Sequence, residues 1–205
     1  MSPSLFRNRT SNLGLVTQTV QWLVLQGVFF VISVFLQQER GYSAIQTGLM
    51  LVPATIGILA SSALAQRMAG RHAMRLLVRA GFTTTIVGLL LLLLLVRKDS
   101  AIWTFWPGLF LMGFGVGVML TASVNVVQSA WPESVQGDIS GVSRSVSNLG
   151  SSLGVAIAGS VIVAATAGGN PPFLTAIIVV GAFAIVGWIA ALLLPRRSPQ
   201  DAPAA

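Results

Sequence analysis

The 205-residue sequence contains no cysteine, a single histidine and only five acidic residues. Without cysteine, the protein has no disulfide framework, no thiolate metal site and no cysteine nucleophile. Charged residues make up 8% of the sequence, whereas a soluble domain has about 25%. Too few charged side chains are therefore present to cover a water-facing surface, and this composition excludes a soluble globular domain.

The single histidine, His72, is a poor candidate for a catalytic base. A serine protease inside the membrane would need a histidine within hydrogen-bond reach of a mid-membrane serine, but His72 lies in a basic loop segment between Arg71 and Arg75. The sequence also has no Walker motif, dinucleotide-binding loop or cluster of metal ligands. We therefore expect neither enzyme activity nor a cofactor or metal.

Long apolar runs fill most of the sequence, of which 54% is hydrophobic. A helix that crosses the hydrocarbon core needs about 20 predominantly apolar residues. Six runs reach this length, separated by short breaks rich in turn-forming residues. The sequence predicts an all-α integral membrane domain of six helices over residues 1–205, with a disordered tail over 195–205. The helices are expected near 13–36, 44–66, 76–96, 102–130, 139–166 and 173–194.

Basic residues mark one side of this predicted membrane domain. The net charge is +7, but Lys and Arg lie between the apolar runs and form no continuous stripe that would bind nucleic acid. Cytoplasmic loops carry an excess of Lys and Arg. An N-terminus inside the cell places Arg7, Arg9, Arg67, Arg71, Arg75, Arg79, Arg144, Arg196 and Arg197 inside, and Arg40, Arg97 and Lys98 outside. We therefore predict a multi-pass protein of the cytoplasmic membrane with both termini in the cytoplasm.

Polar side chains divide the predicted helices into two kinds. The third and sixth have few polar groups, which indicates lipid-facing helices. The first and fourth each carry a polar face, whose residues are Gln18, Gln21, Trp22, Gln26, Thr121, Asn125 and Gln128. An unpartnered amide in hydrocarbon is costly, so these faces should contact protein or a wet cavity. Two interpretations are open: hydrogen bonds between helices, or the lining of a substrate cavity.

Small residues form a stripe along the fifth predicted helix, at steps of three and four. The stripe consists of Ser143, Ser147, Ser151, Gly154 and Ala158, with Gly150 beside it. Gly150 and Gly154 form a GxxxG pair, as do Gly113 and Gly117 in the fourth helix. Small residues let helix backbones approach closely in a membrane, so the stripe predicts a tightly packed face. Pro53, within the second helix, predicts a kink there.

No acidic residue falls in the interior of a predicted spanning helix. Glu39, Asp99, Glu133, Asp138 and Asp201 lie at helix ends, in loops or in the tail. Proton-coupled carriers usually hold a carboxylate within the membrane. If the protein works with a proton gradient, we expect the proton site on another chain or on a part absent from this sequence.

Several motifs match one family in their order and spacing. They are Leu5-Phe6-Arg7-Asn8-Arg9, the pattern G-x-S-x-x-x-x-G-L-x-x-x-P over 41–53, Trp106-Pro107-Gly108, the glycine-rich run 113–117, and Gly137 and Gly141 followed by 148–157. With these motifs, the sequence resembles the C-terminal half of a major facilitator superfamily transporter, in the fourteen-helix drug:proton antiporter branch. The loop over 66–75 resembles the superfamily's basic loop, but Gly70 stands at its acidic position and Ala73 at its second glycine.

This resemblance implies half of a major facilitator fold, built from 3+3 inverted repeats, within a secondary active multidrug efflux carrier that works by alternating access. It implies that the first and fourth helices line the substrate cavity, with the polar and aromatic residues named above. The second and fifth helices would face the other half, and the small-residue stripe would form the interface between halves. The third and sixth would be peripheral. The residues expected at a cytoplasmic gate or loop are Arg67, Arg71, Arg75 and Arg144.

The expected partners follow from the same resemblance. They are the lipid bilayer, an amphipathic small-molecule substrate, and an N-terminal half that carries the proton site, in the same or a separate chain. Two alternatives stay open. The protein could be a half-transporter that works as a parallel homodimer, or a non-transporting membrane subunit in which the stripe is an assembly face.

Overall fold

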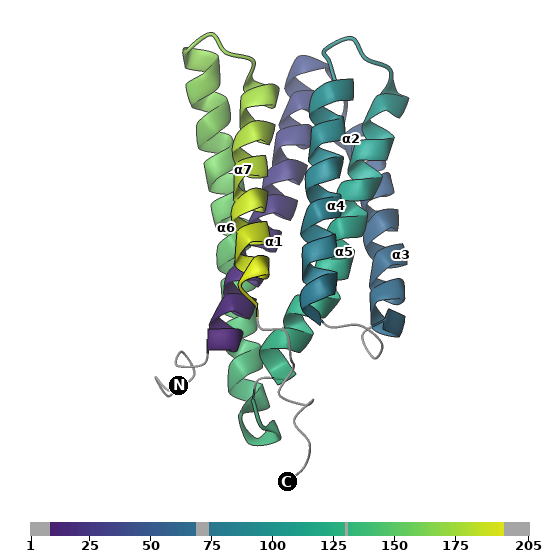
Figure 1. Cartoon of the computed structure of the whole chain (residues 1–205). Helices are drawn as coiled ribbons and strands as arrows, with labels where there is room; N and C mark the ends of the chain where they lie inside the picture. The colour runs from purple at the N-terminus through teal and green to yellow at the C-terminus, as the bar shows by residue number, and fades with distance from the viewer. Residues whose placement is uncertain (1–8, 69–73, 130, 195–205) are drawn as a thin grey trace.

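The computed structural model describes residues 9–68, 74–129 and 131–194, and these residues form a bundle of helices (Figure 1). The predicted tail over 195–205 lies outside the described residues. The main helices are α1 (Arg9–Val34), α2 (Ala44–Met50), α3 (Val52–Met68), α4 (Met74–Leu95), α5 (Phe105–Ser129), α6 (Gln136–Ala167) and α7 (Pro172–Leu192). Three short elements adjoin them: the π-helix η2 (Phe35–Glu39) and the 3-10 helices η3 (Ile102–Thr104) and η4 (Glu133–Val135).

Six helices in the described part of the chain are long and apolar enough to cross a membrane. They extend over Thr10–Glu39, Ala44–Arg67, Met74–Leu95, Ile102–Gln128, Gln136–Ala167 and Pro172–Leu192. The all-α fold with six spanning helices is thus confirmed. We call the end of the bundle at which α1 begins and α7 ends the terminal side (Figure 1).

The second spanning helix is interrupted near Pro53, as the sequence predicts. Its first segment, α2, begins at a capping box: the Ser43 hydroxyl accepts from the Gln46 N–H, and the Ser43 N–H donates to Gln46 Oε1. The two segments meet at Leu51, whose N–H bonds to the Gly48 carbonyl at 3.1 Å. Since proline has no N–H to donate, the regular helix ladder cannot continue through this point.

The helices pack as two interlocked sets of three. Helices α1 and α5 lie at the centre and contact each other; α6 and α7 pack on α1, whereas α3 and α4 pack on α5. Helix α4 also contacts α7. If α1, α3 and α4 are exchanged with α5, α6 and α7, these contacts are reproduced. The exception is that α6 contacts α7, whereas α3 and α4 have no comparable contact. Helices α1 and α5 run in opposite directions (Figure 1). The packing is that of 3+3 inverted repeats.

Glycines allow the central helices to approach their neighbours closely. A Cβ added at Gly113 of α5 would overlap the backbone of Ala54 in α3, and one added at Gly88 of α4 would overlap the backbone of Met112 in α5. On the other side of the bundle, Gly154 of α6 lies against the Leu23 carbonyl of α1. The glycine pairs predicted from the sequence are therefore contacts between helices within this chain.

At the end of the bundle opposite the terminal side, Arg40 connects two loops through hydrogen bonds. Its Nη2 donates to the Arg97 carbonyl and, at 2.9 Å, to Ser100 Oγ. The guanidinium also lies 5.5 Å from the ring centroid of Phe35 and 5.1 Å from that of Phe105, which are cation–π distances. The loop after α1 and the loop before α5 are thus joined at this end.

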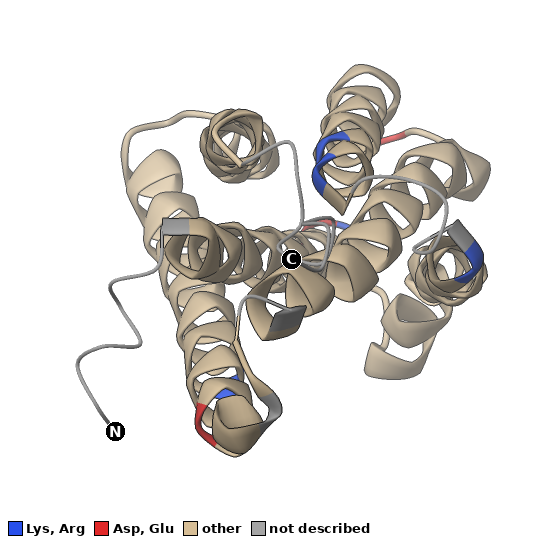
Figure 2. Ribbon diagram, turned by 60° about the horizontal axis from the view of Figure 1, so that its bottom comes forward, with Lys and Arg blue, Asp and Glu red and all other residues tan. Residues whose placement is uncertain are grey.

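Charged residues lie towards the helix ends and in the loops (Figure 2). The ion pair that the structure describes joins Lys98 Nζ to Glu39 Oε2 at 3.4 Å, with both side chains exposed. Asp99 lies in the same loop region, and Asp138 in the first turn of α6. The carboxylates of the described chain are therefore at the ends of the spanning helices and not at their middle.

Candidate functional site

The crossing of α1 and α5 brings two polar faces to one place on the terminal-side half of the bundle. Ser123 Oγ in α5 lies 3.1 Å from Gln21 Oε1 in α1 and can donate to it. About two helix turns before Gln21, a Cβ added at Gly14 of α1 would overlap the Val127 side chain of α5. At this crossing Gln21 comes from the predicted polar face of α1, whereas Ser123 of α5 was not among the predicted residues.

Gln18 connects α1 to α6 and is buried, with 3% of its surface exposed. Its Nε2 donates to Ser143 Oγ at 2.7 Å and to Ser147 Oγ at 2.9 Å, and its Oε1 accepts from Ser143 Oγ at 2.9 Å. All the polar atoms of this amide therefore have partners inside the chain. The geometry of Gln18 therefore agrees with the first of the two interpretations, in which the amide forms hydrogen bonds between helices.

Gln21 is fully buried, but only one of its two polar side-chain atoms has a hydrogen-bond partner. Its Oε1 accepts from Ser123, whose hydroxyl also lies 2.7 Å from the Met119 carbonyl. Its Nε2 has no hydrogen-bond partner among the residues that the structure describes. Because a buried amide N–H without a partner is costly, this group needs an acceptor from water, from a substrate or from another part of the protein.

The other predicted cavity residues lie at the surface of the two central helices. Trp22 and Gln26 on α1 are half-buried, as are Thr121, Asn125 and Gln128 on α5. The side chains of these five have no hydrogen-bond partner among the described segments, although the Gln128 carbonyl accepts from Gln136 Nε2 at 3.0 Å. The predicted residues therefore fall into two groups. Gln18 and Gln21 point into the bundle, whereas the remaining five are half-buried on α1 and α5. We call these five residues the central strip.

The small-residue stripe of α6 faces α1 in this structure. Gly150 and Gly154 lie against the backbone of Thr19 and Leu23, and Ser143, Ser147 and Ala158 are buried. Ser151 is half-buried and donates to the Ser147 carbonyl at 3.0 Å. The resemblance implied that this stripe contacts a second half, but most of it is already covered within the chain. The exposed apolar side chains of α6 are instead Leu149, Leu153, Val155 and Val163.

The basic residues predicted for a gate have separate environments. Arg67 is exposed at the end of α3, and Arg71 lies outside the described residues. Arg144 is exposed on α6. Arg75 is half-buried in the first turn of α4 and donates from Nη2 to the Leu192 carbonyl of α7 at 2.6 Å. Arg67, Arg75 and Arg144 lie on three different helices, α3, α4 and α6, and the gate stays a prediction.

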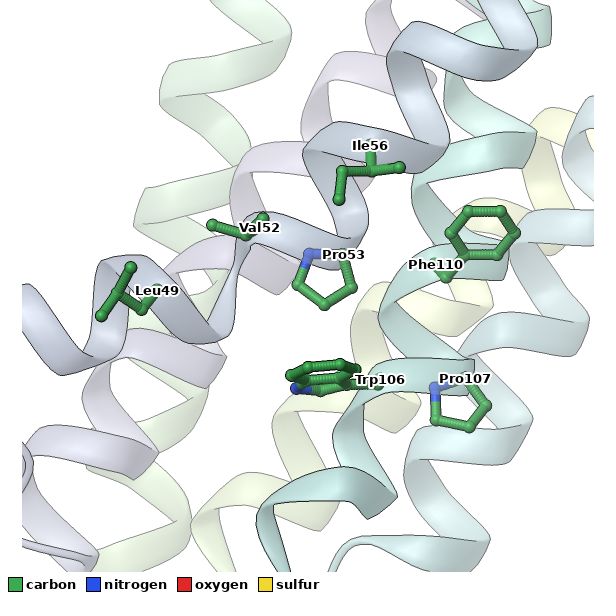
Figure 3. A pocket seen from close by; sticks show the side chains of 7 residues that line it. All are labelled: Leu49, Val52, Pro53, Ile56, Trp106, Pro107 and Phe110. Atoms are coloured by element: carbon green, nitrogen blue, oxygen red, sulfur yellow. The ribbon is translucent and has the colours of Figure 1, made fainter.

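An apolar groove of about 580 Å³ lies between α2, α3 and α5, away from the terminal side (Figure 3). Its lining residues are Leu49, Val52, Pro53, Ile56, Trp106, Pro107 and Phe110. In Figure 3, the rings of Pro53 and Trp106 face each other across this space. The groove is not evident from the sequence, in which Pro53 and the Trp106-Pro107 pair belong to separate motifs. The break in the second helix places them on opposite walls.

Two curated proteins similar to this chain are named for drug resistance and for transport. The chain is 32% identical to the multidrug resistance protein Stp of Mycobacterium tuberculosis over 164 residues, which are 80% of this chain and 30% of Stp. It is 25% identical to the probable actinorhodin transporter of Streptomyces coelicolor over 160 residues, 77% of this chain and 28% of that protein. The chain thus spans about a third of the length of these curated relatives.

A solved structure shows the same fold. It is that of a bacterial homologue of the human drug peptide transporters PepT1 and PepT2, with a TM-score of 0.79 and 16% sequence identity, over 91% of this chain and 41% of that one. The sequence model of the Major Facilitator Superfamily matches residues 14–205. With a six-helix bundle that has the packing of inverted repeats, this chain belongs to the Major Facilitator Superfamily.

Proposed function

We propose that this chain is the C-terminal half of a multidrug efflux carrier that works by alternating access. The family assignment and the drug-resistance relatives support a carrier of small molecules. In carriers built from repeats, the substrate site lies near the middle of the membrane, and one half of the protein rocks against the other around it. Helices α1 and α5, at the centre of this bundle, are the ones that would line the site.

The observation that carries this proposal is the central strip. Trp22, Gln26, Thr121, Asn125 and Gln128 remain half-buried on the two central helices without side-chain partners in the described segments. Amides on a surface that faced lipid alone would be costly. Exposed side chains on the outer helices α4 and α7, by contrast, include the apolar residues Leu90, Leu94, Ile178 and Ile185. We therefore assign the central strip to a wet path that faces a second half.

Amphipathic drugs suit the chemistry of this strip. The amides of Gln26, Asn125 and Gln128 can donate and accept hydrogen bonds, and the indole of Trp22 offers a large apolar face with one N–H donor. Binding sites for small molecules are mostly apolar with a few polar groups that orient the ligand. We expect the strip to bind drugs with low specificity, because none of its five residues is charged and could select for a charged group.

The proton site of this carrier would lie outside the described helices. The acidic residues that the structure describes are at helix ends and in loops, whereas proton relays in carriers use carboxylates inside the membrane. The relatives are about three times as long as the matched region, which leaves room for such a group in an N-terminal half. In this proposal the present chain contributes substrate contacts, and the other half contributes the coupling to protons.

The other half would cover the exposed apolar faces of α3 and α6. Ile56 and Leu59 on α3 and Leu149 and Val163 on α6 are large and exposed in the isolated chain. The N-terminal half could be in the same chain or a separate one, or its place could be taken by a second copy of this chain. The same faces would serve for assembly if the protein were a non-transporting subunit.

The distribution of Lys and Arg along the sequence supports termini in the cytoplasm. Arg67 and Arg144 are exposed near that side, whereas Arg40, Arg97 and Lys98 lie at the opposite end. We therefore place the protein in the cytoplasmic membrane, with α1 entering from the inside.

An efflux assay tests the proposed function. The chain would be produced in cells that lack their own drug pumps, alone and together with an N-terminal half supplied as a separate chain, and the accumulation of ethidium would be measured. We expect the pair to lower dye accumulation and a protonophore to abolish the effect, because coupling to protons would drive the export. Accumulation that neither the chain nor the pair lowers would contradict transport and favour the assembly subunit.

A further inference from the structure

The apolar groove and the central strip lie on one face of α5. Phe110 lines the groove. Thr121, Asn125 and Gln128 belong to the central strip. At 3.6 residues per turn, these four residues and Phe114 fall within an arc of about 60° around the helix. The ring centroids of Phe110 and Phe114 are 6.1 Å apart. The groove therefore continues the central strip towards the end of the bundle opposite the terminal side.

Helix α1 shows the same change of side chains. Trp22 and Gln26 of the central strip are followed about one turn later by Phe29, on the same face. Phe29 on α1 and Phe114 on α5 are both half-buried. On both central helices, amide side chains on the terminal side thus give way to aromatic rings towards the opposite end. The proposed substrate path is therefore polar at one end and apolar at the other.

The composition of the groove selects for an apolar ligand. Its volume of about 580 Å³ is within the range of pockets that bind small molecules. Among the seven residues that line it, the indole N–H of Trp106 is the one polar side-chain group. A charged or strongly polar group would lose its hydrogen bonds to water in this space, which is costly. We therefore expect the groove to receive the apolar part of a molecule.

The shape of the groove favours a flat ring system. The rings of Pro53 and Trp106 face each other across the space (Figure 3). Pro53 is buried on α3, which packs closely on α5 where Gly113 lies against the backbone of Ala54. An aromatic ring that stacks on the Trp106 indole gains an interaction beyond the burial of its apolar surface. A lipid acyl chain has no ring to stack, so the facing rings favour an aromatic ligand over lipid.

The groove and the amide of Gln26 are within reach of one molecule. Gln21 of α1 lies beside Ser123 of α5, to which it is hydrogen-bonded. Gln26 is five residues beyond Gln21, and Phe110 is thirteen residues before Ser123, on helices that run in opposite directions. The difference of eight residues corresponds to about 12 Å along the helix axis. A polycyclic aromatic molecule with a polar substituent spans this distance.

We propose that the groove binds the planar aromatic part of an amphipathic substrate, while Gln26 holds the polar group of the same molecule. This assignment rests on the proposed efflux function and adds the substrate class and its orientation. The polar group points towards the terminal side, and the fused rings point towards the opposite end. Trp106 stacks on the rings, and the exposed side chains of Val52 and Ile56 cover their edges. The groove is thus the apolar end of the substrate path.

Binding of 1-aminoanthracene, a neutral and planar fused-ring amine, tests this assignment. The full chain would be placed in lipid nanodiscs, and the dissociation constant would be measured from the rise in probe fluorescence, with empty nanodiscs as the blank. Trp106→Ala removes the stacking partner and should weaken binding about two- to tenfold. Ile56→Trp puts a bulky ring into the groove and should weaken binding by at least the same factor.

The outer helix α7 offers a matched control. Ile185 is 49% exposed, against 52% for Ile56, and does not line the groove. Ile185→Trp should therefore leave the affinity for the probe unchanged. A loss in Ile185→Trp equal to that in Ile56→Trp would overturn the assignment, because the effect would not come from the groove.

The remaining outcomes separate the possible occupants. Unchanged affinity in either Trp106→Ala or Ile56→Trp would overturn the assignment and favour lipid acyl chains as the occupant. Efflux of ethidium by the chain together with an N-terminal half would in that case leave the proposed function intact. If the N-terminal half removes the dependence of probe binding on Trp106, a side chain of that half fills the groove and the assignment is wrong. Probe binding that depends on Trp106, in a pair that exports no ethidium, would support the groove as an aromatic site and contradict the proposed efflux.

Discussion

Alanine at Gly154 is expected to destabilise the helix bundle by about 1–3 kcal/mol, the range observed when extra groups are forced into a packed interior. A Cβ at this position would overlap the carbonyl oxygen and carbon of Leu23 in α1. A backbone cannot move aside as the end of a flexible side chain can, so α1 and α6 would have to separate. Their separation would also strain the hydrogen bonds of Gln18 with Ser143 and Ser147. The measurement is the free energy of unfolding in mixed micelles.

The same helix offers a matched control for this substitution. Gly141, also in α6, has no atom within 4 Å of the position that a Cβ would take. Alanine is a better helix former than glycine, so Gly141→Ala is expected to stabilise the protein by about 0.5–1 kcal/mol. If both substitutions had the same effect, the α1–α6 contact would not depend on close approach at Gly154.

Replacing two glutamines of α1 is expected to separate structural from functional amides. Gln18→Leu removes four hydrogen bonds to Ser143 and Ser147 in the interior and should lower the free energy of unfolding by about 1–2 kcal/mol. Gln26 is half-buried and belongs to the central strip. Gln26→Leu should leave stability within about 0.5 kcal/mol and reduce efflux about two- to tenfold, the effect of losing one hydrogen bond to a substrate.

The free energy of unfolding in micelles and the accumulation of ethidium are measured for both variants. Gln37→Leu is a control for the loss of an amide on the first spanning helix, because Gln37 is exposed beyond the central strip. A loss of stability in Gln26→Leu as large as in Gln18→Leu would show that both amides connect helices. Unchanged efflux in Gln26→Leu would contradict the assignment of the central strip to the substrate path.

The sequence is sufficient to predict the six spanning helices, because each needs only length and hydrophobicity. The break at Pro53 is predictable for a similar reason: a missing N–H acts within one helix turn, whatever the surroundings. The tight packing of Gly154 and Gly113 is predictable as a property of small residues, but the identity of the partner helix is not. A stripe on one helix carries no information on which of five other helices covers it.

The same limit applies to the polar face of α1. Gln18, Gln21 and Gln26 lie on one side of a helical wheel, yet Gln18 is bonded to α6, Gln21 to α5, and Gln26 to no described side chain. Their different roles depend on where α5 and α6 cross α1. The apolar groove is a further case, since Pro53 and Trp106 are far apart in sequence and become neighbours only through the packing of α3 on α5.

Labelling of introduced cysteines most directly tests the central claim, that this half of a carrier crosses the membrane six times with both ends in the cytoplasm. The sequence has no cysteine, so each introduced thiol is unique. Gly41 and Gly169 are poor positions because their φ angles are 68° and 70°, which a side chain would strain. The exposed residues Gln38, Asn170 and Ser134 serve instead.

An impermeant maleimide would be added to intact cells. The account predicts that Gln38→Cys and Asn170→Cys react with it, whereas Ser134→Cys, between α5 and α6, reacts only after the membrane is permeabilised. Labelling of Ser134→Cys in intact cells, with none of the other two, would contradict the proposed orientation and the assignment of the central strip to a path that opens between the cytoplasm and the outside.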